Sequence, residues 1–504
     1  MLIGLYNGLM SAFIKRYKAK NGATVIQVVF KHGRQVVKTV HIGTAHNDIQ
    51  EAELRSVASE TILAGQLTMD IFGDDPDGLD MLTEKTYSSL LWDTMSEVYD
   101  SLGFDCICDE VFKQLVLARI IEPTSKFDSI RVIANLGLKP PTNAQIHRTL
   151  NRVVERDYRG QLSTECLKRT APFALTLLLY DVTTLYFEVQ KEDDFRKGGM
   201  SKERRLEPQI TLGLLTGRDG FPLEIMSFEG NRAEVKTIME VLGAFQMRHG
   251  LDEMTITADA AMLSSKNIQE LEDAGYHYII GSRIAKTPWE IAEYAKEPGA
   301  ELEDGQVFDL YTDMNTGKAQ KRIGRRVIYQ YKAKRAKMDL LNIDKLLDKA
   351  KKMLDGKAEY RRNRFLKVKG QTKEINYELV EQSRLKAGIK GYVTDLDIAA
   401  QEVIDAYHQL FEIERSFRMS KSDLKARPIF HHKRDSIEAH LTVVFAALAI
   451  SRVIQARTGL SIKRFKNTLE PIRTSVVRIG GKSRAIPPLV PSAVRSIISD
   501  LQNR

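Results

Sequence analysis

Three polar side chains recur at intervals of seven residues in the segment YHQLFEIERSFRMSK, namely Tyr407, Glu414 and Lys421. An α-helix turns by about 100° per residue, so seven steps fall about 20° short of two turns, and a helical segment presents all three side chains on one stripe. A carboxylate between a phenol and an ammonium suits a metal-bound phosphodiester, because the carboxylate can bind the metal and the cation a phosphate. The alternative is a solvated helix face on which Glu414 pairs with Arg418, four residues further on.

Two more carboxylates follow apolar runs upstream. Asp181 comes directly after ALTLLLY (174–180), and Asp259 comes directly after MTITA (254–258). A continuous apolar run such as the first predicts a strand that is buried on both faces. A carboxylate at the end of a buried strand is costly unless it has a partner. For each aspartate taken alone, a metal ion and the backbone N–H groups of a cap or turn are alternative partners.

The order of the predicted elements brings the two aspartates together. Three strands, beginning with 174–180, are followed by a helix, a strand, a helix and a strand, which is the element order of an RNase H-like fold. In that fold the first and fourth strands lie side by side and parallel, so Asp181 and Asp259 would project from adjacent strands. Two carboxylates so close raise each other's pKa unless a divalent cation lies between them, and Mg²⁺ prefers such oxygen ligands. With Glu414 as a third ligand, the sequence predicts a site for phosphoryl transfer, in which two metal ions can act.

The composition indicates a globular protein with an acidic partner. The chain has 504 residues, of which 43% are hydrophobic, and this is enough for cores in roughly three or four domains. It carries 75 Lys and Arg against 66 Asp and Glu, a net charge of +9, which favours nucleic acid as the partner. A generic basic protein is the alternative.

The cysteines and the apolar runs indicate the compartment. The three cysteines, Cys106, Cys108 and Cys166, are too few for a disulfide framework and favour a reducing cytosol. The longest apolar run, Leu441–Ile450, has ten residues, whereas a membrane span needs about 18–20, so no membrane partner is expected. The apolar N-terminus precedes its first charge, Lys15, and a signal peptide has the reverse order.

Two regions are predicted in the first 170 residues. Residues 1–75 are expected to form a β hairpin followed by a helix, whose lysines either touch a DNA backbone or are solvated edge-strand lysines. Residues 80–170 are expected to form a helical, helix-turn-helix-like DNA-binding region, with caps at Asp109, Ser125 and Thr142. Its last helix carries basic residues that would face phosphates, among them Arg148 and Arg152. The alternative is a helical spacer with a solvated basic face.

The rest of the chain predicts a core in two parts. Residues 171–285 would form the first part, 286–395 a basic insertion domain, 396–456 the helical region that completes the core, and 457–504 a basic tail. From Lys321 to Lys369 there are eighteen Lys and Arg against five Asp and Glu. This one-sided charge favours a surface for a nucleic-acid backbone over a merely solvated helix face.

These motifs resemble insertion-sequence transposases of the DDE class, in the subgroup with a Tyr-(x2)-Arg-(x3)-Glu-(x6)-Lys signature. Tyr407, Glu414 and Lys421 match that signature at the right spacing, and Leu410 replaces the usual Arg, as in a branch with a Tyr-x-x-Leu-(Trp/Phe)-x-Ile-Glu pattern. The likeness continues in five further segments: YDVTTLYFE (180–188), LGLLTGRDGFPL (212–223), FEGNRAEVKTI (228–238), TADAAMLS (257–264) and LKARPIFHH (424–432).

The resemblance implies an α/β fold with an RNase H-like catalytic core, interrupted by a β-containing insertion. It implies Asp181, Asp259 and Glu414 as catalytic metal ligands for Mg²⁺, with two ions expected and Mn²⁺ as a substitute. Tyr407 and Lys421 would contact DNA. The role of the arginine that Leu410 replaces would be missing or would pass to one of two residues of the same helix: Arg415 or Arg418.

The function implied is a transposase that binds the terminal inverted repeats of an insertion sequence, cleaves at the element ends and joins them to target DNA. Its partner would be double-stranded DNA, and a homodimer on paired ends is expected in a bacterial cytoplasm, at the nucleoid when bound to DNA. Two alternatives stay open. One is a catalytically decayed transposase that acts as a DNA-binding protein, and the other is an RNase H-type nuclease without strand transfer.

Overall fold

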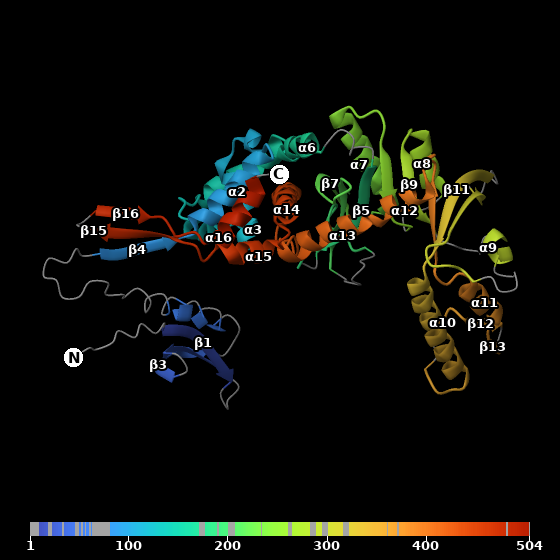
Figure 1. The fold of residues 1–504 in the computed structure, drawn as a ribbon, viewed down its shortest axis with the longest axis horizontal. Coiled ribbons are helices and arrows are strands. Elements are labelled where there is room, and N and C mark those ends of the chain that lie inside the picture. Colours follow the sequence, from blue (N-terminus) through green and yellow to red (C-terminus); the bar gives the residue numbers. More distant parts are fainter. Residues whose placement is uncertain are drawn as a thin grey trace. The chain divides into compact units, whose positions relative to one another are not determined.

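The chain divides, in a computed structural model, into two compact units, which are Met1–Thr86 with Thr474–Pro487 and Tyr87–Arg473 with Pro488–Arg504 (Figure 1). All three candidate catalytic carboxylates lie in the second unit. The structure describes residues 10–18, 23–32, 35–45, 50–51, 54–55, 57–59, 62, 81–170, 177–188, 191–199, 207–232, 234–260, 265–282, 289–294, 301–315, 322–359, 361–369, 372–479 and 482–502.

The first unit contains two antiparallel three-stranded sheets. One has the order β1-β2-β3, in which β2 and β3 confirm the predicted hairpin and β1 adds a third strand. Ile26 and Val28 of this sheet are fully buried against Ala58, one of the helical residues between 50 and 62. The other sheet has the order β16-β15-β4. The strands are β1 (Met10–Lys18), β2 (Thr24–His32), β3 (Gln35–Ala45), β4 (Met81–Tyr87), β15 (Thr474–Ile479) and β16 (Lys482–Ile486).

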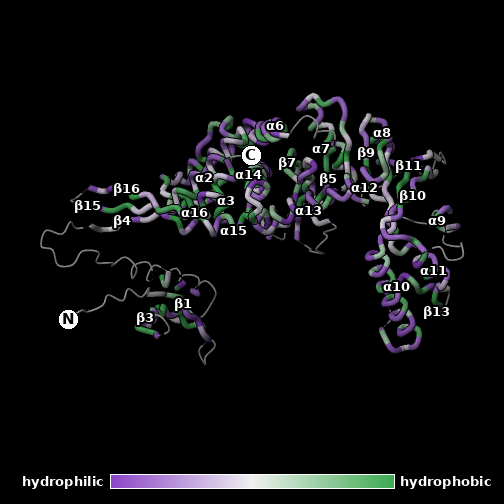
Figure 2. Tube along the Cα trace, in the orientation of Figure 1, coloured by the Kyte–Doolittle hydropathy of each residue, from purple (hydrophilic) through white to green (hydrophobic). Residues whose placement is uncertain are grey.

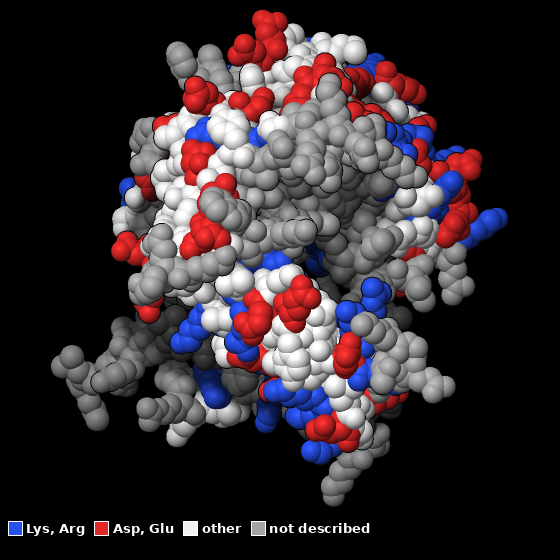
Figure 3. All heavy atoms as spheres, turned by 90° about the vertical axis from the view of Figure 1, so that its right-hand side faces the viewer, with Lys and Arg blue, Asp and Glu red and all other residues white. Residues whose placement is uncertain are grey.

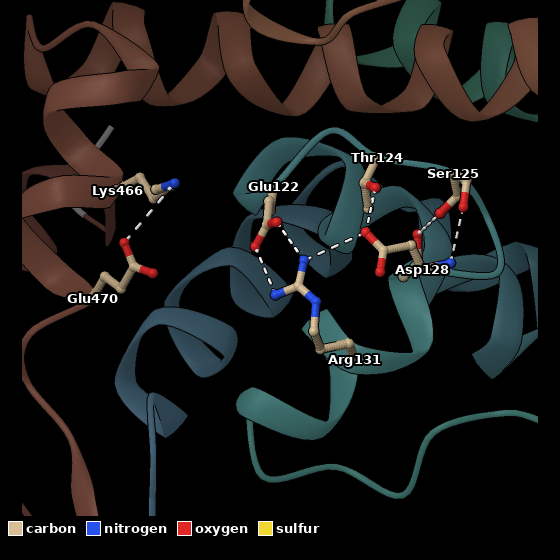
Figure 4. A network of polar contacts seen from close by, with 8 residues as sticks. Glu122, Thr124, Ser125, Asp128, Arg131, Lys466 and Glu470 are labelled. Atoms are coloured by element: carbon tan, nitrogen blue, oxygen red, sulfur yellow. Dashed lines mark hydrogen bonds and ion pairs between the residues drawn. The ribbon is translucent and has the colours of Figure 1, made fainter. Parts of the chain in front are cut away.

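Short helices with tight links begin the second unit from Ser89 on, whereas the first residues of the region predicted as helical, 80–170, form the strand β4 of the first unit. They are α2 (Ser89–Ser101), η1 (Phe104–Ile107), α3 (Glu110–Ile121), α4 (Ser129–Asn135), α5 (Asn143–Glu155) and α6 (Tyr158–Arg169). Asp109 caps α3 by accepting a hydrogen bond from the Phe112 N–H, and Thr142 caps α5 in a capping box. In the link between α3 and α4, Arg131 pairs with both Glu122 and Asp128 (Figure 4).

The helix α14 (Arg434–Thr458) is the centre around which these helices pack. It contacts α2, α3, α5 and α6, together with two later helices, α15 (Ile462–Leu469) and α16 (Ser492–Gln502). Among the described residues, α14 is the one helix long and apolar enough to cross a membrane, but 94% of that apolar stretch is buried inside the protein. Burial in a core therefore accounts for its composition.

An eight-stranded mixed sheet forms the rest of the second unit, in the order β10-β11-β14-β9-β8-β5-β6-β7. β8 pairs in parallel with β5 and β9, whereas the other neighbours are antiparallel. The predicted pairing of the first and fourth core strands is therefore confirmed. The strands are β5 (Leu177–Tyr186), β6 (Gln209–Thr216), β7 (Pro222–Glu229), β8 (Thr255–Ala258), β9 (His277–Ser282), β10 (Val307–Asn315), β11 (Arg322–Tyr331) and β14 (Ile389–Thr394).

Helices cover both faces of this sheet. Tyr180 of β5 shares a hydrogen bond of 2.8 Å with Thr237 of α7, so Asp181, the next residue, points to the opposite face, where α13 contacts β5. Three helices lie between β7 and β10, namely α7 (Glu234–His249), α8 (Ser265–Asp273) and α9 (Trp289–Tyr294), and two follow β14, namely α12 (Ala400–His408) and α13 (Leu410–Arg418).

The segment predicted as an insertion, 286–395, has two parts in the structure. Three of its strands, β10, β11 and β14, extend the central sheet. The remainder comprises α10 (Ala333–Leu354), α11 (Tyr377–Leu385) and a hairpin of β12 (Leu366–Lys369) and β13 (Thr372–Ile375), around the fully buried Phe365. Figure 2 shows hydrophilic residues recurring along α10, as expected from its high content of Lys and Asp.

Candidate active site

The first predicted acid, Asp181, lies within β5 and not at its end. The strand continues to Tyr186, because Val182, Thr183 and Thr184 are β-branched and keep pairing with β6. The Asp181 carboxylate accepts a hydrogen bond of 2.7 Å from the Val182 N–H. The prediction of a strand end at this residue was wrong, but the predicted burial of the strand before it is confirmed.

The second acid, Asp259, directly follows the four buried residues of β8, as predicted. β5 and β8 pair in parallel through Leu179 and Thr257, and each aspartate lies two residues beyond this pair. The two aspartates therefore leave adjacent strands at the same level and on the same face. The Asp259 carboxylate accepts hydrogen bonds from the Ala260 N–H at 2.6 Å and from the Tyr407 hydroxyl at 3.1 Å.

The third acid, Glu414, lies on α13, an amphipathic helix whose residues Ile413 and Phe417 are buried. A cavity of about 320 Å³ is lined by Glu414 together with Asp181 and Asp259. The structure thus brings the three predicted carboxylates, from three separate elements, to one hollow. Glu414 and Arg418 form no ion pair with each other, since none is found between these two described residues.

The donor set of this hollow suits a divalent metal, because all three acids offer hard oxygen ligands and lie on adjacent elements. Within the described ranges, however, no group of three His, Cys, Asp or Glu side chains is close enough to hold one metal ion. The residue types of the three acids nevertheless fit a hard divalent cation, which this cavity would hold.

Tyr407 is 4% exposed and lies on α12, between the sheet and the cavity. Burial, followed by the neighbouring Asp259 charge, raises the pKa of Tyr407, so the hydroxyl stays protonated and donates to Asp259. Gly281 of β9 makes room for it, since a Cβ there would lie 2.4 Å from the Tyr407 hydroxyl oxygen. The structure thus gives Tyr407 a contact with an acid, and the predicted contact with DNA stays a prediction.

The predicted single helix through Tyr407, Glu414 and Lys421 is interrupted twice. α12 ends at His408, α13 begins at Leu410, and a π-helical turn, Met419–Asp423, follows α13. The extra residue per turn in the π-helix moves Lys421 off the ideal stripe. Lys421 nevertheless lines a hollow together with Asp181 and Glu414.

A second hollow, of about 500 Å³, is lined by Asp181 and Glu414 together with three cations. The cations are Lys421, Arg418 and Arg427. Arg427 was not among the residues predicted from the sequence, although it lies in the LKARPIFHH segment, which could have indicated it. The carboxylates thus have cations within the same hollow, where a phosphate would be attracted.

The remaining predicted DNA contacts lie apart from the carboxylates. Arg415 pairs with Glu412 at 2.9 Å. Arg148 is exposed on α5, and Arg152 of the same helix binds the Asp109 carboxylate that caps α3. Leu410, the departure from the signature, lines the carboxylate cavity and offers no charge there.

Lys390 of β14 is the cation that lines the carboxylate cavity itself. Its ammonium nitrogen lies 4.2 Å from the centroid of the Tyr407 ring. Burial and then Arg335 lower the pKa of Lys390, whereas Asp259 and Glu414 act in the opposite direction. No sequence signal indicated this residue, because its strand reaches the site only through the order of the sheet, across the whole 286–395 segment.

Comparison with known proteins gives a match to one family model and similarity to solved structures. The model of the family described as "Transposase DDE domain" matches residues 172–450, which is more than half of the chain. No curated protein matches. Among solved structures, the chain is similar to one described as a cryo-EM structure of piggyBac transposase synaptic complex with hairpin DNA. The identity is 10% and the TM-score 0.37, over 76% of this chain and 70% of that one.

Proposed function

The chain belongs to the transposase DDE domain family, and on this premise we propose that it cleaves DNA at the ends of an insertion sequence and joins them to target DNA. The observation that carries the proposal is that Asp181, Asp259 and Glu414 line one cavity. We propose further that the strands β5 to β9 form an RNase H-like core, whose strand order is β7-β6-β5-β8-β9.

We propose that Asp181, Asp259 and Glu414 hold Mg²⁺, with two ions expected and Mn²⁺ as a substitute. A bound divalent ion supplies charge stabilisation to a phosphoryl group. The protein's own residues position the reactants: the Tyr407 hydroxyl orients Asp259, and the cations of the neighbouring hollow, with Lys421 among them, attract phosphates of the DNA.

The DNA partner in this proposal is double-stranded, both as the terminal inverted repeats and as target. The helices α3 to α5 would contact the ends, with Arg148 on the exposed side of α5. Arg152 is held by Asp109, so it would position α5 as well as contact phosphates. A homodimer on paired ends, in a bacterial cytoplasm and at the nucleoid when bound to DNA, completes the proposal, with no membrane partner.

Substitution of each acid tests the site. We expect Asp181→Asn, Asp259→Asn and Glu414→Gln to lower cleavage of a DNA fragment with one element end by at least about a hundredfold, because metal charge stabilisation contributes several kcal/mol. Binding of the same fragment should persist. Glu402→Gln, at an exposed carboxylate of α12 outside the cavity, is the matched control and should cleave normally. Full cleavage by any of the three acid variants would refute the site.

Two simple assays separate the rival functions. A decayed transposase would bind the end fragment but show no cleavage with Mg²⁺ or Mn²⁺, whereas we expect cleavage that EDTA abolishes. A nuclease without strand transfer would cut the fragment but leave a pre-cut 3′ end unjoined to a target plasmid. Joined product, detected as a labelled plasmid, would favour the transposase.

A further inference from the structure

A hollow of about 600 Å³ adjoins the carboxylate cavity, and the two share Asp259, Lys390 and Tyr407 in their walls. We call it the basic cleft. It is lined on one side by β9 and β14 of the central sheet and on the other by α10, the segment before β12 and the residues after α11. Figure 3 faces the end of the second unit that carries these elements, and shows Lys and Arg on its lower part, interspersed with Asp and Glu.

Four cations line the basic cleft, against two carboxylates. The cations are Arg335, Arg364, Lys386 and Lys390, and the carboxylates are Asp259 and Asp339. Asp339 is engaged within the protein, since it accepts a hydrogen bond of 3.1 Å from the Gly388 N–H and lies 3.5 Å from Arg335. The cleft therefore has more positive charge than its own carboxylates can balance.

Two of these cations are available to a ligand. Arg364 is exposed, and its guanidinium lies 5.9 Å from the centroid of the Phe365 ring. Lys390 lies against the rings of Tyr407 and Tyr392, at 4.2 Å and 5.6 Å. Within the described part of the chain, the side chains of Arg364 and Lys390 form neither a hydrogen bond nor an ion pair. Aromatic contacts hold a cation in place without neutralising it, so an anion can still bind.

Lys390 stands at the junction of the two hollows, because it lines both. The other three cations come from separate segments that line the cleft, namely α10, the segment before β12 and the residues after α11. A small anion needs one focus of charge. A nucleic-acid strand carries one charge per nucleotide along its length, so a spread of cations that leads away from an active site suits a strand.

We propose that the basic cleft binds the backbone of the DNA strand that continues from the bond being cut, with Lys390 on the phosphate at the junction and Arg364 on a phosphate further along. This inference rests on the proposed function in so far as the carboxylate cavity receives DNA. It assigns a role in substrate positioning to Lys390 and to the 333–386 segment, which the signature residues do not cover.

Hydroxyl-radical footprinting in EDTA tests the proposal without cleavage. The probe is a labelled fragment of about 250 base pairs that contains one terminus of the element encoding the protein and its flanking DNA. We expect Arg364→Ala and Lys390→Met to lose protection at a few consecutive phosphates of one strand beside the terminus. Affinity should fall about fivefold to tenfold, and the slope of log affinity against log salt should become shallower by about 0.9 for each lost contact.

Matched variants separate the cleft from general charge. Arg361→Ala removes an exposed arginine three residues before Arg364, which pairs with Glu359 and does not line the cleft. Lys351→Met removes an exposed lysine of α10 that does not line the cleft either. Both should keep the full footprint, and Lys390→Arg should restore it. The proposal is overturned if Arg364→Ala and Arg361→Ala give the same footprint and salt slope.

The outcome also distinguishes this inference from the proposed function. A wild-type protein that never cleaves, but whose footprint depends on Arg364 and Lys390, would refute the chemistry and leave the cleft intact. A wild-type protein that cleaves, with unchanged footprints in both variants, would refute the cleft alone. Thermal unfolding of each variant should match the wild type, since Arg364 is exposed and Lys390 makes only ring contacts.

Discussion

The two aspartates of the site are oriented by their own backbone. Asp181 accepts a hydrogen bond from Val182 N–H at 2.7 Å, and Asp259 accepts one from Ala260 N–H at 2.6 Å. A carboxylate has about four lone-pair positions, so these bonds fix its orientation and leave capacity for a metal ion. Asp259 has one more support, the Tyr407 hydroxyl, and Tyr407 is therefore linked to one of the three proposed metal ligands.

Substitution of that tyrosine should separate orientation of the acid from contact with DNA. We expect Tyr407→Phe to lower the cleavage rate by about 10–100-fold, because a hydrogen bond to a charged group contributes about 1.5–3 kcal/mol. Binding of the end fragment should change less than twofold or so. Single-turnover cleavage and titration of the same DNA measure the two effects.

Tyr392→Phe is the control for this prediction, because its ring packs on Tyr407 but its hydroxyl lies 3.4 Å from His408 and not near an acid. It should cleave within about threefold of the wild type. If Tyr407→Phe instead weakened DNA binding while bound DNA was cut normally, the tyrosine would act on DNA, as the family resemblance implies.

The helix α13 is the element that carries Glu414, and its start is fixed to the rest of the second unit. Glu412 forms an ion pair of 2.8 Å with Arg452 of α14, and Arg452 also binds the Asp219 carbonyl. The Ser416 hydroxyl donates to the Gly220 carbonyl at 2.7 Å. Gly220 has φ of +74°, and a Cβ there would lie 2.7 Å from the Glu412 carbonyl, so the turn between β6 and β7 must carry glycine.

Loss of this anchor should affect both stability and catalysis. Burial raises the pKa of Glu412, but Arg452 and Arg415 outweigh it and hold that pKa below its usual value. Arg452→Met leaves a partly buried carboxylate with one partner fewer, so we expect a loss of about 2–3 kcal/mol. The melting temperature should fall, and cleavage with it, because α13 positions Glu414.

Arg415→Met provides the comparison, since it removes the more exposed partner of the same carboxylate, with 37% of the arginine side chain exposed. A change within about 1 kcal/mol is expected. Equal melting temperatures for the two variants would show that α14 does not anchor α13 through this contact.

Local patterns were sufficient for much of the core. The buried runs before Asp181 and Asp259 predicted β5 and β8, and the element order predicted their parallel pairing, because each of these signals is contained in a short segment. The caps at Asp109 and Thr142 were predicted for the same reason. The sequence was therefore enough to predict that the three carboxylates belong to one site.

Long-range pairing could not be predicted in the same way. That β14 joins β9, and so places Lys390 beside Asp259, depends on strand pairing across the entire 286–395 segment, which no local periodicity records. The break at Gln409 and the π-helical turn at Met419–Asp423 also escaped prediction, because the seven-residue spacing is compatible with a continuous helix. Tertiary contacts decided both features.

Across the second unit, the three hollows form a series. The basic cleft shares Asp259 and Tyr407 with the carboxylate cavity, and this cavity shares Asp181 and Glu414 with the hollow that contains Lys421. Acids therefore occupy the middle of the series, and cations occupy both ends. This order suits a polyanion that passes over the acids, since metal ions would neutralise the centre and side chains the flanks.

The histidines around α14 should make the stability of the whole second unit depend on pH. His440 is 3% exposed, its Nδ1 lies 2.7 Å from the Lys126 ammonium nitrogen, and its Nε2 lies 3.1 Å from the Ala426 carbonyl oxygen. A neutral ring that accepts at Nδ1 and donates at Nε2 satisfies both contacts. Burial, and then Lys126 and Arg119, lower the pKa of His440, and burial also lowers the pKa of His431 to about 3.

The lowered pKa of His440 determines the direction in which stability changes with pH. Above about pH 6.5 the histidine is neutral in both states, so its full contribution to stability is present. As the pH falls, only the unfolded chain takes up the proton at this histidine. The free energy of unfolding therefore falls by about 2 kcal/mol for His440 alone by pH 5. We therefore expect the melting temperature to fall clearly between pH 7.5 and pH 5.

His440→Gln tests this prediction, because an amide can accept from Lys126 and donate to the Ala426 carbonyl but does not titrate. Its melting temperature should fall less than that of the wild type between pH 7.5 and pH 5, as measured by scanning calorimetry in buffers of equal ionic strength. Parallel curves for the two proteins would mean that folding does not change the pKa of His440, and would contradict the prediction.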